Sequence, residues 1–206
     1  MDVVLASSSP ARLATLQAAG VHPRVIAPDV DESTIQTDDT AALAGELARA
    51  KGEVVAARLG SEGLREPTVL IACDTLLEIE GHTYGKPGSA ETAIVRWYRM
   101  RGRQGLLHTG HYVALMDPVR STHQLRVAST VVHFADLSDA EIAAYAATGE
   151  PERVAGGFTI DGFGGAFVTS IEGDPHNVVG ISLPLVRQML LDLGVSWPSL
   201  WRQRQS

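Results

Sequence analysis

The chain has little of several features that would each point to a particular class of protein. Among its 206 residues there is one cysteine, Cys73, which excludes an internal disulfide and a zinc site made of several cysteines. No apolar run approaches the roughly 18 residues that a helix needs to cross a bilayer. An acid, Asp2, stands where a signal peptide would carry basic residues, and the apolar stretch around it is short. We therefore expect a cytoplasmic protein without a membrane partner.

Positive charge is scarce as well. Lys and Arg together number 17 against 24 Asp and Glu, which gives a formal net charge of −7 at pH 7. Proteins that bind duplex nucleic acid usually carry a basic surplus, so no nucleic-acid partner is expected. A small anionic substrate is compatible with this charge, because a cleft can be locally positive on an acidic protein.

Lysine is the rarer of the two basic residues: only Lys51 and Lys86 stand against 15 arginines. Codon bias alone explains this imbalance in one interpretation. In the other, the two lysines mark positions where a compact ammonium group is needed and a planar guanidinium does not fit. Composition leaves both interpretations open.

The periodicity of apolar residues predicts one α/β domain over residues 1–206. Strands are expected at 2–6, 24–27, 68–79, 106–116 and 125–134. Helices are expected from Pro10 to a stop at Gly20, at 39–59, at 89–100, from the cap 136–138 to about Ala147, at 183–193 and around Ser199. The glycine-rich segment 153–173 is expected to form short strands and tight turns. The order of elements predicts a mixed sheet, with two lobes about a cleft.

Two groups of residues have a structural rather than a functional interpretation. Trp97, Tyr98 and Met100 lie at helical spacing and are expected in the core, not on a base-stacking surface. His108 and His111 lie three apart in a predicted strand, a spacing that does not indicate a metal site, and are interpreted as incidental.

A serine cluster where the first strand turns into the first helix is one candidate site. Such a junction exposes backbone N–H groups at the positive end of a helix, and Ser7, Ser9 and Arg12 would add donors for an anion. In the alternative, Ser9 simply caps the helix ahead of Pro10, and Arg12 is solvated.

Asp74 follows the apolar run 68–73 and is the second candidate. An ionised carboxylate beside a buried strand is costly unless it is paired, hydrogen-bonded or bound to a metal. Such carboxylates often act as general bases or metal ligands. In the alternative, Asp74 is a turn or cap residue just beyond the core.

Two weaker candidates contain the lysines. Lys86, in Gly85-Lys86-Pro87 after a predicted hairpin, suits a phosphate group, although such tripeptides also occur in ordinary surface turns. Glu32, in an acidic loop, and Lys51, on the helix 39–59, suit a Mg²⁺ site that is completed by substrate phosphates. Spacing alone favours a solvated loop and a surface lysine.

Taken in order, these segments resemble the Maf family of nucleoside triphosphate pyrophosphatases from about Val4 to Leu190. Leu-Ala-Ser-Ser-Ser-Pro-Ala-Arg at 5–12 is similar to the family's opening Leu-Ala-Ser-x-Ser-Pro-Arg-Arg. Further matches are the acidic loop 30–32, the lysine helix 47–51, Cys-Asp-Thr at 73–75, Gly-Lys-Pro at 85–87, and the carboxy-terminal segments 155–164, 171–173 and 177–184, with Ser182 as an extra residue. Each match is weak alone, whereas all of them in register form a strong signal.

The resemblance implies a fold similar to that of the inosine triphosphate pyrophosphatases, in which an elongated sheet forms the bottom of a cleft between two lobes. It implies hydrolysis of a nucleoside triphosphate between its α- and β-phosphates, in a house-cleaning role. Asp74 would be the catalytic base, while the substrate would be bound by Ser7, Ser9, Arg12, Lys51 and Lys86. Glu32 and Asp74 would hold a divalent cation, Mg²⁺ or alternatively Mn²⁺. The family also suggests a homodimer.

The sequence departs from the family at two positions associated with base selection in its pyrimidine-selective branch. The first arginine after Ser-Pro is Ala11 here, and a glutamine is replaced by Asp161. With Thr75 they form the predicted specificity set, and the preferred base stays open.

Two rival functions follow from the same segments. A nucleotide-binding regulator of septum formation would need no base such as Asp74. A phosphatase would release orthophosphate instead of pyrophosphate.

Overall fold

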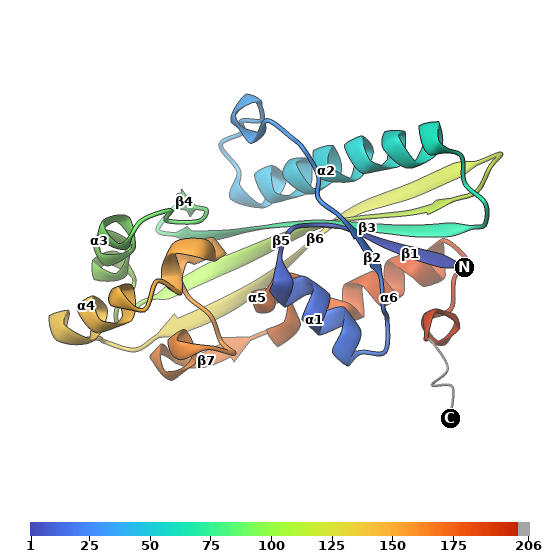
Figure 1. Cartoon of the computed structure of the whole chain (residues 1–206). Coiled ribbons are helices and arrows are strands. Elements are labelled where there is room, and N and C mark those ends of the chain that lie inside the picture. Colours follow the sequence, from blue (N-terminus) through green and yellow to red (C-terminus); the bar gives the residue numbers. More distant parts are fainter. Residues whose placement is uncertain (202–206) are drawn as a thin grey trace.

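The computed structural model describes residues 1–201 and is organised around one long mixed sheet (Figure 1). Its strands are β1 (Asp2–Ala6), β2 (Arg24–Ile26), β3 (Thr68–Ile79), β4 (His82–Tyr84), β5 (Gln104–Met116), β6 (Ser121–Phe134) and β7 (Val168–Glu172). They lie in the order β2-β1-β3-β5-β6-β7, with β4 paired to β3. The pairs that β1 makes with β2 and β3 are parallel, and the other pairs are antiparallel. Residues 202–206, the end of the predicted domain, lie outside the described residues.

Helices cover both faces of this sheet. They are α1 (Pro10–Ala18), α2 (Thr40–Glu62), α3 (Ala90–Met100), α4 (Asp139–Ala147), α5 (Pro175–Val179) and α6 (Leu183–Asp192). Figure 1 shows α2 along one face, α1 and α6 against the other, and α3 with α4 at one end. This arrangement confirms the predicted α/β class with an elongated mixed sheet flanked by helices. Within residues 1–201, no helix combines the length and apolar character required to span a bilayer.

Strand β3 is buried on both faces, as its apolar run predicts. Alternate residues enter two different cores because successive side chains of a strand point to opposite faces. One core, under α1 and α6, includes Val3, Leu5, Ile71, Cys73, Val186 and Met189. The other, under α2, includes Val4, Ala6, Leu70, Ala72, Val55 and Leu59. The same alternation sends the next two side chains, Asp74 and Thr75, to opposite faces of the sheet.

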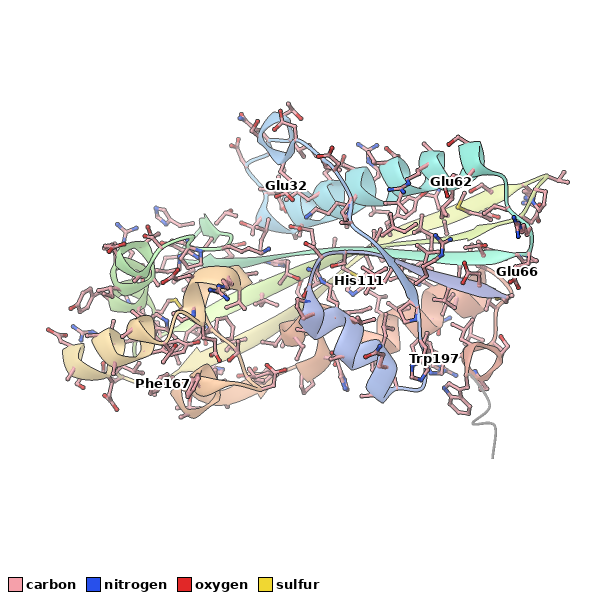
Figure 2. The ribbon with its side chains drawn as sticks, viewed as in Figure 1. Glu32, Glu62, Glu66, His111, Phe167 and Trp197 are labelled. Carbon is pink, nitrogen blue, oxygen red and sulfur yellow. The ribbon has the colours of Figure 1, made fainter. Side chains whose placement is uncertain are left out.

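A third core lies under α3 and α4. Trp97 is fully buried there and packs edge-on against Phe134 and Phe167. Figure 2 shows Phe167 near this end of the molecule. Met100 is buried as predicted, but the prediction for Tyr98 was wrong, since 43% of it is exposed. The buried face of α3 is formed by Ala93, Arg96, Trp97 and Met100, and Tyr98, about 100° further round the helix from Trp97, lies outside that face.

Helix α2 packs unusually close to strand β5 because glycines replace side chains at the contact. A Cβ atom at Gly110 of β5 would overlap the carbonyl oxygen of Ala44 in α2. A Cβ atom at Gly52 of α2 would overlap the ring of Tyr112 in β5. Gly110 is also the residue paired with Asp74 across β3 and β5. The backbone of the helix therefore lies close to the sheet beside Asp74.

Three parts of the chain differ from the sequence-based expectation. β6 begins at Ser121, four residues before the predicted start. The prediction missed residues 121–124 because they are all polar and show no apolar periodicity. The segment 153–173 contains 3₁₀ turns and one strand, β7, instead of several short strands. Gly156 and Gly157 have φ of 73° and 76°, which a strand does not allow. The short helix α5 was not predicted.

The close packing of α2 makes Gly110 a position that does not accept a side chain. We expect Gly110→Ala to lower the free energy of unfolding by about 1–3 kcal/mol, because the backbone of α2 must move away. Gly60→Ala is the control, since Gly60 lies in α2 and an added Cβ there has nothing within 4 Å. It should leave stability unchanged or raise it by up to about 1 kcal/mol. Urea unfolding measures both, and equal stabilities for the two variants would contradict the account of the packing.

Candidate functional site

An unpaired edge of β3 determines where the site lies. On the side away from β5, β1 pairs with β3 only as far as Ala72, and β4 pairs with it only from Leu77 onward. Residues 73–76 therefore have no strand partner on this edge within the described chain. After Ala6, the chain leaves the sheet and turns into α1. A pocket of about 960 Å³ opens at this gap.

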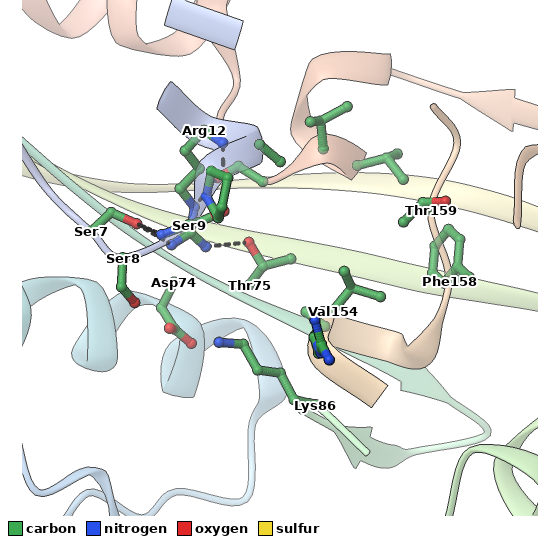
Figure 3. A pocket seen from close by; sticks show the side chains of 18 of the residues that line it. Ser7, Ser8, Ser9, Arg12, Asp74, Thr75, Lys86, Val154, Phe158 and Thr159 are labelled. Carbon is green, nitrogen blue, oxygen red and sulfur yellow. Dashed lines mark hydrogen bonds between the residues drawn. The ribbon is translucent and has the colours of Figure 1, made fainter. Parts of the chain in front are cut away.

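The pocket brings together every site residue predicted from the sequence. These residues are Ser7, Ser9, Ala11, Arg12, Glu32, Lys51, Asp74, Thr75, Lys86 and Asp161. Figure 3 shows six of them, Ser7, Ser9, Arg12, Asp74, Thr75 and Lys86. One wall comes from the β1–α1 turn and the opposite wall from segment 148–161, beside α4. The predicted cleft between two lobes thus corresponds to this pocket.

Arg12 ties the first wall to the sheet and to the carboxy-terminal part of the chain. Its Nε donates to Gly180 O at 2.8 Å, Nη1 to Ser7 Oγ at 3.2 Å and Nη2 to Thr75 Oγ1 at 2.9 Å. The hydroxyl of Thr75 is also 3.1 Å from that of Thr109 on β5. Arg12 therefore has a structural contact at each end of its guanidinium, and the interpretation of a freely solvated Arg12 is wrong.

The serine hydroxyls organise the turn. Ser9 is the N-cap of α1 with Pro10 behind it, as predicted, and its Oγ accepts from Arg12 N at 3.5 Å. Ser7 is buried, and its Oγ accepts from Ser9 N at 3.1 Å as well as from Arg12. Hydrogen bonds among its own residues thus fix the conformation of the turn.

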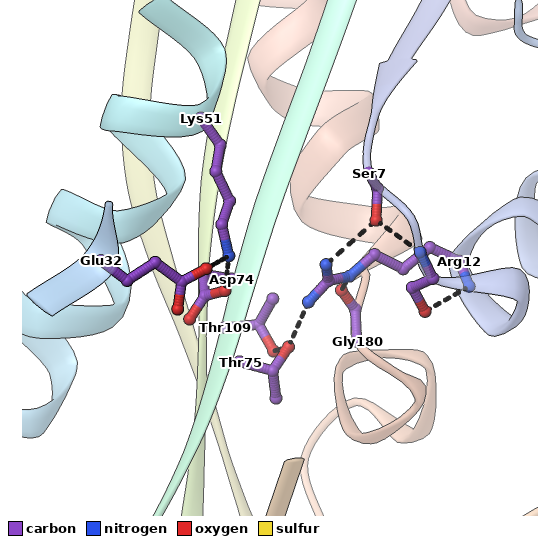
Figure 4. Close-up of polar contacts among 9 residues, drawn as sticks. Ser7, Arg12, Glu32, Lys51, Asp74, Thr75, Thr109 and Gly180 are labelled. Carbon is purple, nitrogen blue, oxygen red and sulfur yellow. Dashed lines mark hydrogen bonds and ion pairs between the residues drawn. The ribbon is translucent and has the colours of Figure 1, made fainter. Parts of the chain in front are cut away.

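On the other face of β3, Lys51 joins two carboxylates (Figure 4). Its Nζ lies 2.7 Å from Glu32 Oε1 and also contacts Asp74 Oδ1. The side chains of Lys51 and Asp74 are each only 13% exposed, whereas that of Glu32 is 53% exposed. Asp74 is therefore a mid-strand carboxylate whose charge is balanced by Lys51, and the interpretation of a cap residue is wrong. Two carboxylates share one ammonium group, which leaves the cluster with one acidic group in excess.

Lys86 and Arg153 supply further positive charge to the pocket. Lys86 follows β4 in an exposed loop, and no ion pair of either residue is found within residues 1–201. Arg153, on the opposite wall, was missed because one arginine among 15 has no distinguishing signal. Ala11 and Asp161 line the pocket and also share a smaller groove beside α1.

Two residues that hold the pocket walls were not identified from the sequence. His111, interpreted above as incidental, is fully buried at the sheet (Figure 2), and its Nε2 accepts from Ser182 N at 2.8 Å. Burial lowers the pKa of His111 to about 4, so the ring is neutral at pH 7 and free to accept. Glu150 accepts four hydrogen bonds. Burial alone would raise its pKa, but hydrogen bonds from Thr159 and two backbone N–H groups outweigh burial and lower it.

A freely exposed surface cation contributes little to folding, whereas Arg12 is held by three hydrogen bonds within the protein. We expect Arg12→Ala to lower the free energy of unfolding of the ligand-free protein by about 2 kcal/mol or more, through the loss of three charge-assisted hydrogen bonds. Lys86→Ala, the control from the same pocket, should change it by less than about 0.5 kcal/mol. Chemical denaturation measures the free energy of unfolding of both variants. An equally small decrease in Arg12→Ala and Lys86→Ala would show that the Arg12 contacts do not stabilise the fold.

Comparisons with known proteins identify the family of the chain. The Maf-like protein family matches residues 2–193. A nucleoside triphosphate pyrophosphatase of Cutibacterium acnes is 52% identical over 199 residues, which cover 96% of this chain and 93% of the relative. One of Salinispora tropica is 52% identical over 206 residues, covering 100% and 90%. Among solved structures, a nucleoside-triphosphatase / dITP/XTP pyrophosphatase of Mycobacterium abscessus covers 66% of this chain and 74% of its own at 14% identity, with a TM-score of 0.33 that is too low to support an inference. The chain belongs to the Maf family.

Proposed function

We propose that this protein is a nucleoside triphosphate pyrophosphatase that removes unwanted nucleotides by hydrolysis to a nucleoside monophosphate and pyrophosphate. The observation that carries the proposal is the buried Lys51–Asp74 pair, set in a pocket that also contains Arg12 and Lys86. The names of relatives that are 52% identical over nearly the whole chain support the same reaction.

Positive groups on the pocket walls suit a triphosphate, which carries about four negative charges near neutral pH. Lys86 is exposed and can turn its ammonium group to a phosphate oxygen. Arg12 uses three N–H donors within the protein and retains two of its five for the substrate. Lys51 lines the pocket and contacts Asp74, so a phosphate oxygen bound there would compete with that carboxylate for its ammonium group.

Asp74 is the proposed general base. Lys51 pairs with its carboxylate and fixes the position of that group in the ligand-free pocket. Once a phosphate oxygen draws the ammonium group away, an Asp74 oxygen is free to accept a proton from water. The water oxygen then forms a bond to phosphorus, the phosphoanhydride bond breaks, and pyrophosphate leaves with the electron pair of that bond.

The carboxylates at this position fit Mg²⁺ that arrives with the nucleotide. Within residues 1–201, no group of three or more His, Cys, Asp or Glu side chains is arranged to hold a metal ion by itself. Glu32 and Asp74 contact one Lys51 nitrogen, and Mg²⁺ typically takes one or two carboxylates, several waters and substrate phosphates. When bound, the ion would neutralise charge on the leaving pyrophosphate. Mn²⁺ has the same preference for oxygen ligands and is the alternative.

The base preference is the finer part of the proposal. Asp161 offers only acceptors where an amide would both donate and accept, and Ala11 removes a long cation from the pocket mouth. We expect the selectivity for dTTP and UTP to be weakened, with a shift toward bases that present an exocyclic amino group, which thymine and uracil lack, such as guanine or cytosine derivatives.

A panel of ordinary and modified nucleoside triphosphates with Mg²⁺ tests the function, with pyrophosphate and orthophosphate measured separately. The proposal predicts pyrophosphate from at least one nucleotide. Orthophosphate as the first product would identify a phosphatase, and binding without turnover would identify a regulator. Strict selectivity of the wild type for dTTP and UTP would contradict the inference about the base.

Substitution of Asp74 tests the general base. Asp74→Asn should remain folded, because the amide is isosteric, and should reduce kcat by about 100-fold or more. Asp38→Asn makes the same chemical change at an exposed position outside the pocket and should leave kcat unchanged. Steady-state pyrophosphate release provides the measurement, and turnover of Asp74→Asn within a few-fold of wild type would remove Asp74 from this role.

Removal of metal tests the carboxylate pair. EDTA should abolish turnover, and added Mg²⁺ should restore it. Glu32→Gln removes one anionic ligand while leaving Asp74 in place, so the Mg²⁺ concentration for half-maximal activity should rise about tenfold or more. Glu46→Gln, on the exposed side of α2, is the control. Full activity in EDTA, or an unchanged Mg²⁺ requirement in Glu32→Gln, would contradict the proposed metal site.

A further inference from the structure

The carboxylate of Glu150 is the centre of a hydrogen-bond network outside the predicted site residues. Its Oε1 accepts from Tyr145 Oη at 2.8 Å, from Thr159 Oγ1 at 2.7 Å and from Gly164 N at 2.9 Å. Its Oε2 accepts from Phe163 N at 2.9 Å. Three of the four donors belong to the loop 158–164, and the fourth lies on α4.

Tyr145 connects this network to the rigid core under α3 and α4. Its ring is buried and packs edge-on against Trp97 and Phe167. Trp97 Nε1 in turn donates to Gly157 O at 2.9 Å, just before the loop. The loop is therefore fastened by the core at its start and by Glu150 at Thr159 and at 163–164.

Two glycines allow the loop to wrap around the carboxylate. A Cβ atom at Gly162 would overlap Oε2 of Glu150, and one at Gly164 would lie 2.5 Å from Tyr145 Oη. The fit leaves no room for a side chain on this side of the loop. Such closeness, with four donors on one carboxylate, favours a single loop conformation.

Asp161 lies at the tip of the loop, between the points that Glu150 holds. It is exposed and lines the pocket, together with Phe158, Thr159 and Ile160. No hydrogen bond between Glu150 and Asp161 is found within residues 1–201, although both line the pocket. The hydrogen bonds of Glu150 therefore act on Asp161 through the loop backbone and Thr159.

We propose that Glu150 is a positioning residue that holds the loop 158–164 as the base-facing wall of the pocket and thereby sets the position of Asp161. This inference rests on the proposed function, because a base-facing wall requires a nucleotide substrate. Glu150 does not touch the phosphates in this account. Its effect should appear in base discrimination and not in the chemical step.

The test is a double-mutant cycle of Glu150→Gln and Asp161→Asn, read as the ratio of kcat/KM between the best and the worst nucleotide of the panel. Glutamine matches the size of Glu150 but places an amino group against N–H donors. We expect Glu150→Gln to raise KM for the best nucleotide about tenfold, to change kcat less than about threefold, and to leave the inhibition constant of pyrophosphate within about twofold of wild type. Asp161→Asn should change the ratio in the wild-type background and have little further effect beside Glu150→Gln.

Glu152→Gln is the matched control, because this carboxylate is two residues away and accepts none of the hydrogen bonds found in the described chain. It should behave as wild type. If Glu150→Gln fails to fold, Tyr145→Phe removes one donor, keeps the carboxylate, and should shift the ratio in the same direction by a smaller factor.

The outcomes separate this inference from the proposed function. A wild type that releases no pyrophosphate from any nucleotide contradicts the proposed function. An active wild type in which folded Glu150→Gln lowers only the melting temperature, with the ratio unchanged, contradicts the positioning role alone. Independent, multiplicative effects of the two substitutions also contradict it, because Glu150 would then not act through Asp161.

Discussion

The contact between α2 and the sheet at Gly110 is the constraint on which the site depends. Because Gly110 has no side chain, the backbone of α2 at Ala44 reaches the sheet directly beside Asp74. Lys51 lies seven residues, or about two turns, further along the helix and so on the same face as Ala44. The four-carbon side chain of Lys51 is long enough to bring its ammonium group to Asp74. If the helix were held at an ordinary distance from the sheet, the ammonium group and the carboxylate would be unpaired in a largely buried place.

The alternation of β3 lets one strand serve two purposes. Asp74 faces α2 and contacts Lys51, while Thr75 faces the opposite side of the sheet and accepts a hydrogen bond from Arg12. Both side chains are reachable from one pocket because the edge of β3 is unpaired between β1 and β4. Arg12 then couples the turn at Ser7 to Gly180, and two residues further on Ser182 donates its backbone N–H to the neutral ring of His111. The ionisable groups of the pocket are thus supported by contacts that also stabilise the fold.

Much of the arrangement of this pocket was predictable, and most of what was missed, Arg153 apart, has a common physical cause. Asp74 and the two lysines stand out because a carboxylate beside a buried strand and a lysine in an arginine-rich chain are each locally unusual. The strands and long helices follow from periodicity, which packing against one sheet reinforces. Glu150, His111 and the 3₁₀ turns of 153–167 have no periodicity, since they are determined by hydrogen bonds between residues far apart or in irregular loops. Such contacts leave no pattern in a single sequence.

The position of a bound nucleotide tests the central claim most directly. In a crystal structure of the Asp74→Asn variant with Mg²⁺ and an uncleaved nucleoside triphosphate, the account predicts the phosphates beside residues 73–76 of β3. It predicts the Lys51 ammonium group on a phosphate oxygen and the base against the loop 158–161. Phosphates bound in the smaller groove beside α1, or a Lys51 still paired with residue 74 and Glu32 while the nucleotide lies elsewhere, would contradict the account.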